Sequence, residues 1–278
     1  MSPARTTSSP SDVAPDTADD GSSDDPLHAG PDVEPLPDRP LALVDAGHER
    51  VLALADYHAG IEAALRAEEG VGAESRADRR RTTVLDAVDE TEPDRLVVLG
   101  DFMHSIGGPG GAERGEIEVL LETIEMPVTV VRGNHDGAID DWLQGAAVTD
   151  ARGTRLGGVG FAHGHTWPAP EVLRAEVVCL GHEHPCVRLT DDVGGRRVER
   201  VWLRGRLSLD PFRAEGYDLP DATSPDLVVF PAFNGLSGGT WVNEERDFLC
   251  PFFPAALRHA ETEAYLLDGT RLGPYGRV

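Results

Sequence analysis

Five apolar stretches of this chain are each followed within one to three residues by aspartate, asparagine or histidine, usually beside a glycine. They are residues 51–55, 96–99, 128–131, 161–162 and 177–180, which lead into Asp56, Asp101, Asn134, His163 and His182. Continuous aliphatic and β-branched stretches of this kind are typical of strands that are buried on both faces. The carboxyl ends of strands in an α/β sheet line one crevice, so we expect all five loops to meet there.

Helical and hairpin patterns occupy the chain between and after these stretches. Apolar residues recur at helical spacing from Ile117 to Ile124, and similar patterns begin at Ile61 and Val84. Turn signals that predict hairpins occur at 153–160, 192–195 and 268–269. Strand–helix–strand units followed by an antiparallel half predict an α/β fold, a four-layer α/β/β/α sandwich of two packed mixed β-sheets flanked by helices.

The first forty residues differ in composition from the rest of the chain. They hold eight of the 21 prolines and nine acidic residues, against Arg5 and Arg39. Such a segment buries too little apolar surface to offset the entropy lost on ordering. We therefore predict a disordered, acidic, Pro-rich tail over residues 1–40 and one folded domain over residues 41–278.

The charge balance is strongly acidic, with 49 acidic residues against 25 basic residues that are all arginine, for a net charge of −24. At ordinary ionic strength this charge argues against nucleic-acid and anionic-membrane partners. The composition also resembles that of proteins from halophilic archaea, and at molar salt a Debye length of about 3 Å removes most of the repulsion. Net charge therefore does not decide the substrate.

Cysteine usage and hydropathy predict a cytoplasmic protein. Cys179, Cys186 and Cys250 show no CxxC spacing, which favours reduced thiols over a disulfide framework. No secretory signal pattern and no stretch of about 18 apolar residues is present, so we expect no membrane partner.

The predicted crevice collects side chains that bind transition metals. They are Asp56, His58, Asp101, Asn134, His135, His163, His165, His182 and His184. Taken singly, each is more often a core histidine or a helix cap. Seven of the ten histidines, however, lie in or beside these loops, and carboxylate with imidazole suits manganese, iron, zinc or nickel. The pattern predicts a site for two divalent metal ions.

The order DYH, GD, GNHD, HGH and GHEH over residues 56–184 resembles the signature of the calcineurin-like metallophosphoesterase superfamily. Residues 100–104, 181–185 and 230–234 are similar to a subgroup of small archaeal and bacterial phosphoesterases, some of which accompany DNA ligase and helicase genes. The chain has Met103 where that subgroup often has lysine. The expectation that this protein is associated with DNA repair rests on this resemblance alone.

The resemblance also implies roles for the site residues. The first metal ion would be held by Asp56, His58 and His184, the second by Asn134, His163 and His182, and Asp101 would bridge them, with manganese the expected ion. A hydroxide between the two ions would attack phosphorus. His135 resembles the catalytic histidine of the family and would protonate the leaving oxygen. Its alternative role is a hydrogen bond that shapes the loop.

Four further residues near the motifs are weaker candidates. Asp136 either orients His135 or caps a helix near Ile139. Substrate contacts are predicted for Arg132, His104 and His165, with an exposed side chain of no catalytic role as the alternative for each.

A local excess of arginine follows the last motif. Residues 188–213 hold seven arginines against four acidic residues. Such a segment predicts a surface that follows nucleic-acid phosphates, with Arg204 and Arg206 as substrate contacts. A solvated hairpin accounts for the same arginines equally well.

The function predicted from the sequence is metal-dependent hydrolysis of phosphodiesters, with nucleic acid or a nucleotide as substrate. One alternative is a phosphomonoesterase or protein phosphatase, since the fold and the metal ligands are shared among these activities. The other is a non-catalytic scaffold, which the retention of all seven candidate ligands and His135 disfavours.

Overall fold

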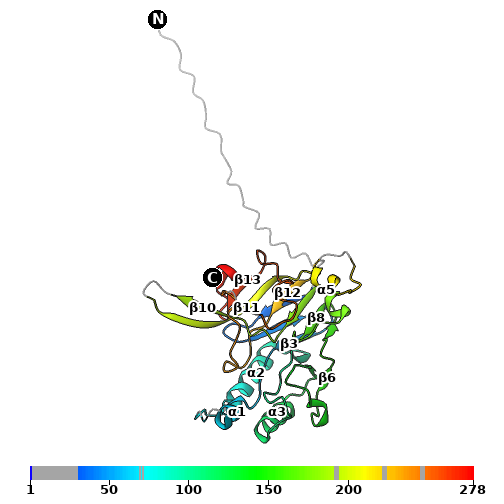
Figure 1. Cartoon of the computed structure of the whole chain (residues 1–278), viewed down its shortest axis with the longest axis vertical. Coiled ribbons are helices and arrows are strands. Elements are labelled where there is room, and N and C mark those ends of the chain that lie inside the picture. Colours follow the sequence, from blue (N-terminus) through cyan, green and yellow to red (C-terminus); the bar gives the residue numbers. More distant parts are fainter. Residues whose placement is uncertain (2–30, 69, 71, 191–193, 221–223, 245–247) are drawn as a thin grey trace.

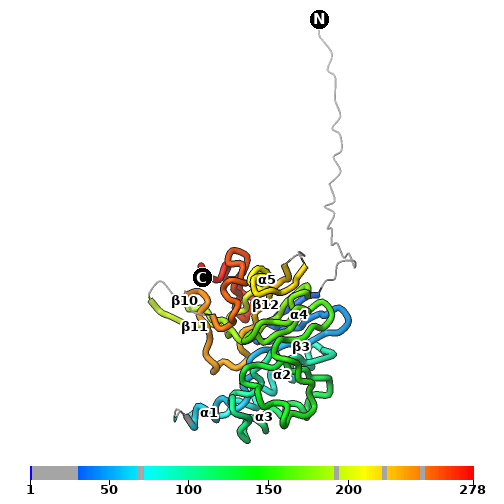
Figure 2. Tube along the Cα trace, turned by 45° about the vertical axis from the view of Figure 1, so that its right-hand side comes forward, coloured from blue at the N-terminus to red at the C-terminus, as the bar shows by residue number. Residues whose placement is uncertain are grey.

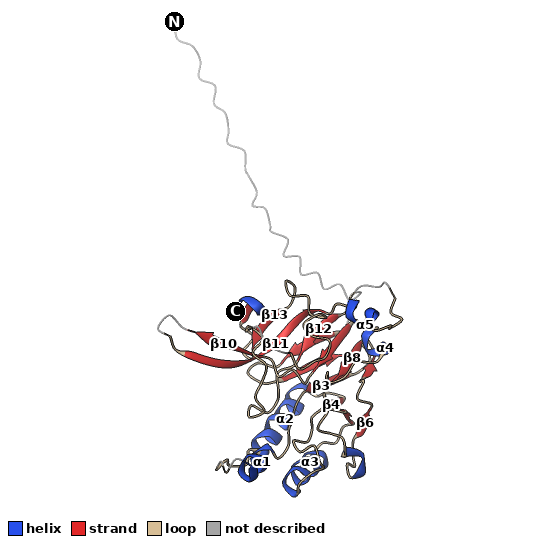
Figure 3. Cartoon of the chain, viewed as in Figure 1, coloured by secondary structure: helices blue, strands red, loops and turns tan. Residues whose placement is uncertain are grey.

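The computed structural model describes residues 1, 31–68, 70, 72–190, 194–220, 224–244 and 248–278. Two mixed β-sheets lie face to face, with three helices outside one sheet and two short helices outside the other (Figures 1 and 3). The predicted four-layer α/β/β/α sandwich is confirmed.

The first sheet has six strands in sequence order. They are β1 (Asp32–Pro35), β2 (Leu41–Asp45), β3 (Arg50–Leu54), β4 (Arg95–Val98), β5 (Val128–Val131) and β6 (Ala147–Thr149). The first three pair antiparallel, and β3 to β6 pair parallel. The carboxyl ends of β3, β4 and β5 therefore lie side by side, as the sequence predicted.

The second sheet has eight strands, seven of them in the order β14-β13-β11-β12-β9-β8-β7, with β10 paired to β11. The strands are β7 (Thr154–Leu156), β8 (Val159–Ala162), β9 (Val177–Leu180), β10 (Cys186–Thr190), β11 (Arg196–Arg206), β12 (Asp226–Val229), β13 (Glu263–Leu266) and β14 (Arg271–Pro274). The predicted hairpins β10–β11 and β13–β14 are present, and the first extends away from the body of the molecule (Figure 2). The expected antiparallel half is interrupted, because β8, β9 and β12 pair parallel.

Three of the helices lie where the apolar periodicity predicted them, and two short helices were not predicted from the sequence. The first sheet is covered by α1 (Ile61–Glu68), α2 (Ala77–Thr91) and α3 (Gly111–Thr123), and the second by α4 (Pro170–Leu173) and α5 (Asp210–Ala214). Short 3-10 helices span Ile139–Asp141 and Tyr275–Arg277. No helix in the described part of the chain has the length and apolar content needed to cross a bilayer.

The alternation of side chains along β3 explains why its sequence is apolar throughout. Val51 and Ala53 contribute to the core between the two sheets, where Phe161 and Trp202 come from the second sheet. Leu52 and Leu54 face the opposite way and pack with residues of α2 and α3. Both faces of the strand are therefore removed from water.

Residues 31–40, which the sequence assigned to a disordered tail, belong to the folded structure. Asp32–Pro35 pairs with β2, and Val33 and Leu36 are buried. The prediction of disorder is wrong for this part, because two apolar side chains are enough when they add to the edge of an existing sheet. Residues 2–30 lie outside the described residues, and disorder there stays a prediction.

Candidate metal centre

The backbone at the strand ends adopts a conformation that L-residues rarely take. Seven described non-glycine residues have positive φ, and five of them belong to the predicted site. These five are Asp56, His58, Asp101, His182 and His184. A conformation of this kind costs free energy and persists only where the surrounding structure enforces it. The fold therefore holds these five side chains in place at the expense of local strain.

Two glycines allow the loops to approach one another closely. A Cβ on Gly133 would lie 2.2 Å from both the amide nitrogen and Oδ1 of Asp101. A Cβ on Gly100, whose φ is 76°, would lie 2.5 Å from the ring of His163. Residues with side chains would separate the loops that the site brings together.

Asp101 occupies the middle of the centre. Its Oδ1 lies 3.4 Å from Nε2 of His163, and its Oδ2 lies 3.9 Å from Nε2 of His58 and 3.7 Å from Nε2 of His135. The amide of His135 donates to Oδ1 at 2.9 Å. The two carboxylate oxygens therefore face histidines from different loops.

The remaining ligand candidates gather around this carboxylate. Oδ1 of Asp56 lies 3.1 Å from Nε2 of His184 and 3.7 Å from Nδ1 of His163. Oδ1 of Asn134 lies 3.1 Å from Nε2 of His163, whose Nδ1 donates to the carbonyl of Leu99 at 2.8 Å. The ring of His182 lies 4.8 Å from the ring of His163. All seven predicted ligands come together.

Among the described residues, the donor atoms form three groups, each of a size that holds one ion, and one of these groups joins His58 to His104 and His135. Asp56, His58 and His184 offer ligand atoms within 4.8 Å of one another, and so do Asp101, His163 and His182. His58 is buried, yet neither of its ring nitrogens has a hydrogen-bond partner among the described residues. A buried imidazole without a partner is costly, and a metal ion would satisfy it. The residues present fit a divalent metal ion.

The electrostatics of the site favour cations. Burial opposes ionisation of Asp101 and Asp56, but the nearby histidines outweigh burial and hold both carboxyl pKa values below their ordinary range. Burial likewise opposes charging of His163, but Asp101 and Asp56 raise its pKa to about 9. By contrast, burial lowers the pKa values of His58 and His182 to about 4. Neutral imidazoles beside ionised carboxylates are the forms that coordinate metals.

His135 is oriented by the loop after β4. Its Nδ1 bonds to the backbone carbonyl of His104, which can only accept a hydrogen bond, so Nδ1 carries the proton. This leaves Nε2 facing the carboxylate of Asp101. His104 lies beside this pair, with its ring centroid 5.7 Å from that of His135 and 5.3 Å from that of His58.

Asp136 joins two loops rather than contacting the ring of His135. Its buried carboxylate accepts from the amides of Met103 at 3.1 Å and Gly133 at 2.9 Å. Its backbone carbonyl accepts from the amide of Ile139, where the 3-10 helix begins. Burial and the charge of Asp101 raise its carboxyl pKa to about 6.

Of the weaker candidates, His165 lies at the centre and Arg132 is engaged elsewhere. The ring of His165 is 5.2 Å from that of His163 and 6.0 Å from that of His182. The guanidinium of Arg132 pairs with Asp140 and donates to the carbonyl of Asp136. Arg132 is therefore turned toward its own loop.

Arg204 and Arg206 are not brought to the centre. Arg206 lies in register with Asp226 of β12, which in turn pairs with Val177 at the amino end of β9. The candidate ligands His182 and His184 follow the opposite, carboxyl end of β9. Arg204 donates to the carbonyl of Val33 at 3.1 Å. The excess of positive charge in the sequence is therefore spread along a long strand.

Three polar residues that support the site were not predicted from the sequence. The side-chain amide of Asn234 donates to the carbonyls of Tyr57 at 3.3 Å and His58 at 3.1 Å. The buried carboxylate of Glu183 accepts from the amides of Leu249 and Cys250. The signal for Glu183 is a charged residue between two candidate ligands, which needs backbone donors once it is buried.

The third such residue is Glu113 in α3. Its carboxylate accepts from the amides of His104 at 3.2 Å, Ser105 at 2.7 Å and Gly110 at 2.7 Å. It therefore holds the loop whose carbonyl orients His135. Nothing in the spacing of an acidic residue near the start of a helix distinguishes it from a helix cap.

The fold and the centre define a class of metal-dependent phosphoesterases with paired sheets. A sequence profile described as calcineurin-like phosphoesterase superfamily domain matches residues 50–202. The chain belongs to the calcineurin-like phosphoesterase superfamily, whose members are phosphate-ester hydrolases that use divalent metal ions.

Two solved structures are similar to this chain. The nuclease MPE of Pseudomonas putida has a TM-score of 0.51 and 19% identity, over 87% of this chain and 100% of that chain. The phosphoesterase Yfce of E. coli has a TM-score of 0.33 and 22% identity, over 51% of this chain and 73% of that chain. The first likeness supports the fold. No curated protein sequence matches the chain significantly.

Proposed function

We propose that this chain hydrolyses phosphodiesters with two divalent metal ions, and that its substrate is a nucleic acid or a nucleotide. The observation that carries the proposal is the position of Asp101. Its two oxygens face histidines of the two different ligand sets, which is the arrangement that a bridging carboxylate requires. Asp56, His58 and His184 would hold one ion, and Asn134, His163 and His182 the other.

Bound ions would supply Lewis-acid stabilisation of the phosphoryl oxygens and a water of lowered pKa. His135 supplies the proton chemistry. Because its Nδ1 is bonded to the carbonyl of His104, the opposite nitrogen, Nε2, is the one available at the centre. Protonated Nε2 would donate to the leaving oxygen as the ester bond breaks. Manganese is the proposed ion, since it suits a donor set that mixes carboxylate and imidazole. Iron, zinc and nickel suit the same donors and are the alternatives.

Two observations favour a diester over a monoester. The structure similar over the whole length of its own chain is that of a protein named as a nuclease. In addition, His165 extends the row of imidazoles beyond the ligands His163 and His182, where it could contact a second substituent on phosphorus. A monoester has no such substituent.

The test compares hydrolysis of an aryl phosphodiester with that of its monoester in high KCl with added Mn²⁺. We expect the diester to react faster and Asp101→Ala to lower its rate by at least about 10³-fold, with fewer bound ions per chain. A faster monoester would reassign the chain as a phosphomonoesterase. Full metal content without turnover of either ester or of nucleic acid would favour the scaffold.

A further inference from the structure

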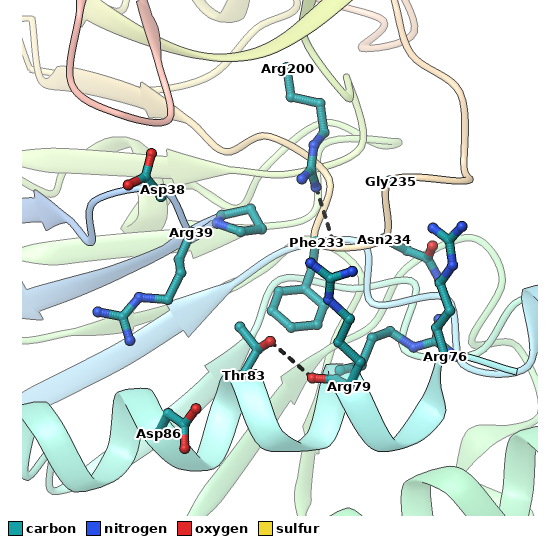
Figure 4. A pocket seen from close by; sticks show the side chains of 12 residues that line it. Asp38, Arg39, Arg76, Arg79, Thr83, Asp86, Arg200, Phe233, Asn234 and Gly235 are labelled. Carbon is teal, nitrogen blue, oxygen red and sulfur yellow. Dashed lines mark hydrogen bonds between the residues drawn. The ribbon is translucent and has the colours of Figure 1, made fainter.

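A cleft of about 350 Å³ lies between α2 and the segment that follows β12. Its walls include Arg76 and Arg79 from the start of α2, Arg200 from β11, and residues 233–235 (Figure 4). The volume is in the range of small-ligand sites. None of the seven proposed metal ligands lines it.

The charges in the cleft are divided between its two ends. Figure 4 shows Asp38 and Asp86 at one end, whereas Arg76 and Arg200 lie with Asn234 at the other. Two further arginines in the lining are neutralised. Arg39 pairs with Glu90, and Arg80 is held by two buried glutamates of α1 and α3.

The remaining arginines have no such neutralisation. The guanidinium groups of Arg76, Arg79 and Arg200 form no ion pair with any described carboxylate, although acidic residues outnumber arginines by two to one in this chain. Arg76 and Arg79 are exposed, and their side chains approach Phe233 and Asn234 across the cleft (Figure 4). Three cationic groups therefore converge on one end without an anion between them.

Arg200 is the most informative of the three. Its Nη1 donates to the carbonyls of Ala232 at 2.6 Å and Phe233 at 3.1 Å, which fixes the guanidinium against the cleft wall. Burial lowers its pKa from the ordinary value and outweighs the opposing charge of Glu199, as expected for a cation removed from water with no described carboxylate at ion-pair distance. A bound anion would relieve that cost.

The cationic end of the cleft adjoins the metal centre. The amide of Phe233 donates to the carbonyl of Ala55, and the amide of Asn234 donates to the carbonyl of Asp56. Arg200 pairs in register with Cys186, two residues after the ligand His184. The segment that forms this wall of the cleft is therefore also hydrogen-bonded to the loop that carries Asp56.

From this placement we propose that the cleft binds a phosphate group of a single-stranded nucleic acid, one that flanks the phosphodiester being cleaved. Planar guanidinium groups match phosphate oxygens in pairs, and Arg200 is held in position before the ligand arrives. The assignment of the bound phosphate to a substrate strand rests on the proposed phosphodiesterase function.

The experiment measures binding of a fluorescently labelled, phosphorothioate-linked single-stranded DNA to the full chain with Mn²⁺, over a series of KCl concentrations. Arg79→Ser removes a charge from the cleft. Arg81→Ser removes the same charge two residues along α2, where Arg81 pairs with Asp78 and does not line the cleft. Hydrolysis of a small aryl phosphodiester is measured for each variant, because that substrate reaches only the metal centre.

We expect Arg79→Ser to weaken DNA binding about five- to tenfold and to lower the slope of log K against log [KCl] by about 0.7, the value for one phosphate contact on a single strand. Arg81→Ser should leave both unchanged, and both variants should hydrolyse the aryl diester like the wild type. Equal DNA affinities and slopes for Arg79→Ser and Arg81→Ser would overturn the proposal.

Two further outcomes separate its parts. If the wild type hydrolyses no diester, the proposed function fails, while the comparison of the two variants still decides whether the cleft binds DNA. If inorganic phosphate binds in an Arg79-dependent manner but DNA affinity does not depend on Arg79, the cleft holds free phosphate, and the assignment to a substrate strand is overturned.

Discussion

The side-chain amide of Asn234 donates to the backbone carbonyl of His58 at 3.1 Å. The same amide donates to the carbonyl of Tyr57, and the backbone amide of Asn234 donates to the carbonyl of Asp56. One residue from the segment after β12 therefore fixes three consecutive carbonyls of the loop that presents two proposed ligands. Both ligands have positive φ, so the loop depends on contacts of this kind to keep its shape.

Asn234→Ala should lower metal affinity about 10- to 100-fold, because the ligands Asp56 and His58 lose the support that orients them. Asn243→Ala is the matched control. Its amide donates to the carbonyls of Arg188 at 2.8 Å and Val278 at 3.1 Å, away from the centre. Both variants should lose about 1–2 kcal/mol of unfolding free energy. Titration with a competing metal chelator measures the affinities, and equal affinities in the two variants would contradict the role of Asn234.

Gly133→Ala should abolish metal binding at the centre. The added Cβ would meet the backbone of Asp101 at 2.2 Å, so the carboxylate proposed to bridge the ions must shift or the loops must separate. Gly137→Ala places the same methyl group where no atom lies within 4 Å, and it should change stability by no more than about 0.5 kcal/mol. Metal content per folded chain distinguishes the two, and normal content in Gly133→Ala would show that the loops yield easily.

The fold was predictable because the buried strands are recognisable in the sequence as continuous apolar stretches. Val51 to Ala55 alternate between two apolar environments, so every position is apolar, and the polar ligand that follows marks where the strand leaves the core. Whether neighbouring strands of the second sheet pair parallel or antiparallel was harder to predict. Neither the length nor the composition of β12 indicates that it pairs parallel with β9, because that depends on where the long connection from β11 returns.

Within the centre, the residues proposed as ligands were found from the sequence, whereas the residues that support them were not. His58 and Asp101 belong to short motifs, whereas Asn234 and Glu113 act through backbone groups, which for Asn234 are also distant in sequence. A hydrogen bond to a backbone carbonyl or amide leaves no residue-type signature at its partner. His165 was only a weak candidate from the sequence, and its ring lies beside those of His163 and His182.

Glu113→Ala should lower kcat while leaving metal content unchanged. The carboxylate holds the amides of His104 and Ser105, and the carbonyl of His104 orients His135. We expect kcat for an aryl diester to fall about 10- to 100-fold, which is less than removal of His135 itself would produce. Glu118→Ala, which removes an exposed partner of Arg114 on the same helix, is the control and should have wild-type kcat. Parallel losses of metal and kcat in Glu113→Ala would indicate general disruption instead.

Removal of the metal ions should destabilise the whole domain. Without cations, the buried carboxylates of Asp56 and Asp101 face each other across a group of neutral and charged imidazoles. Ions that bind only the folded state at roughly 100 times their dissociation constant add about 2.7 kcal/mol to the unfolding free energy. Thermal unfolding should therefore shift upward with Mn²⁺ and downward with chelator. Asp101→Ala should show a much smaller shift, and a melting temperature independent of Mn²⁺ in the wild type would refute binding at this centre.

The buried network of Arg80 should make stability depend on acid pH. Arg80 donates to Glu62 at 2.6 Å and to Glu116 at 2.7 Å. Burial raises the carboxyl pKa of Glu62, but the bonds from Arg80 outweigh burial and hold it below the ordinary value of 4.5. A carboxyl whose pKa is lower in the folded state contributes stability above the unfolded pKa and loses it as pH falls.

Glu62→Gln should therefore be about 2 kcal/mol less stable than the wild type at pH 7, and the difference should shrink as pH falls below 4.5. Glu90→Gln, which breaks only the exposed pair with Arg39, should cost less than about 0.5 kcal/mol at every pH. Urea unfolding over this pH range measures both, and a constant gap between wild type and Glu62→Gln would mean that the charge of Glu62 does not stabilise the fold.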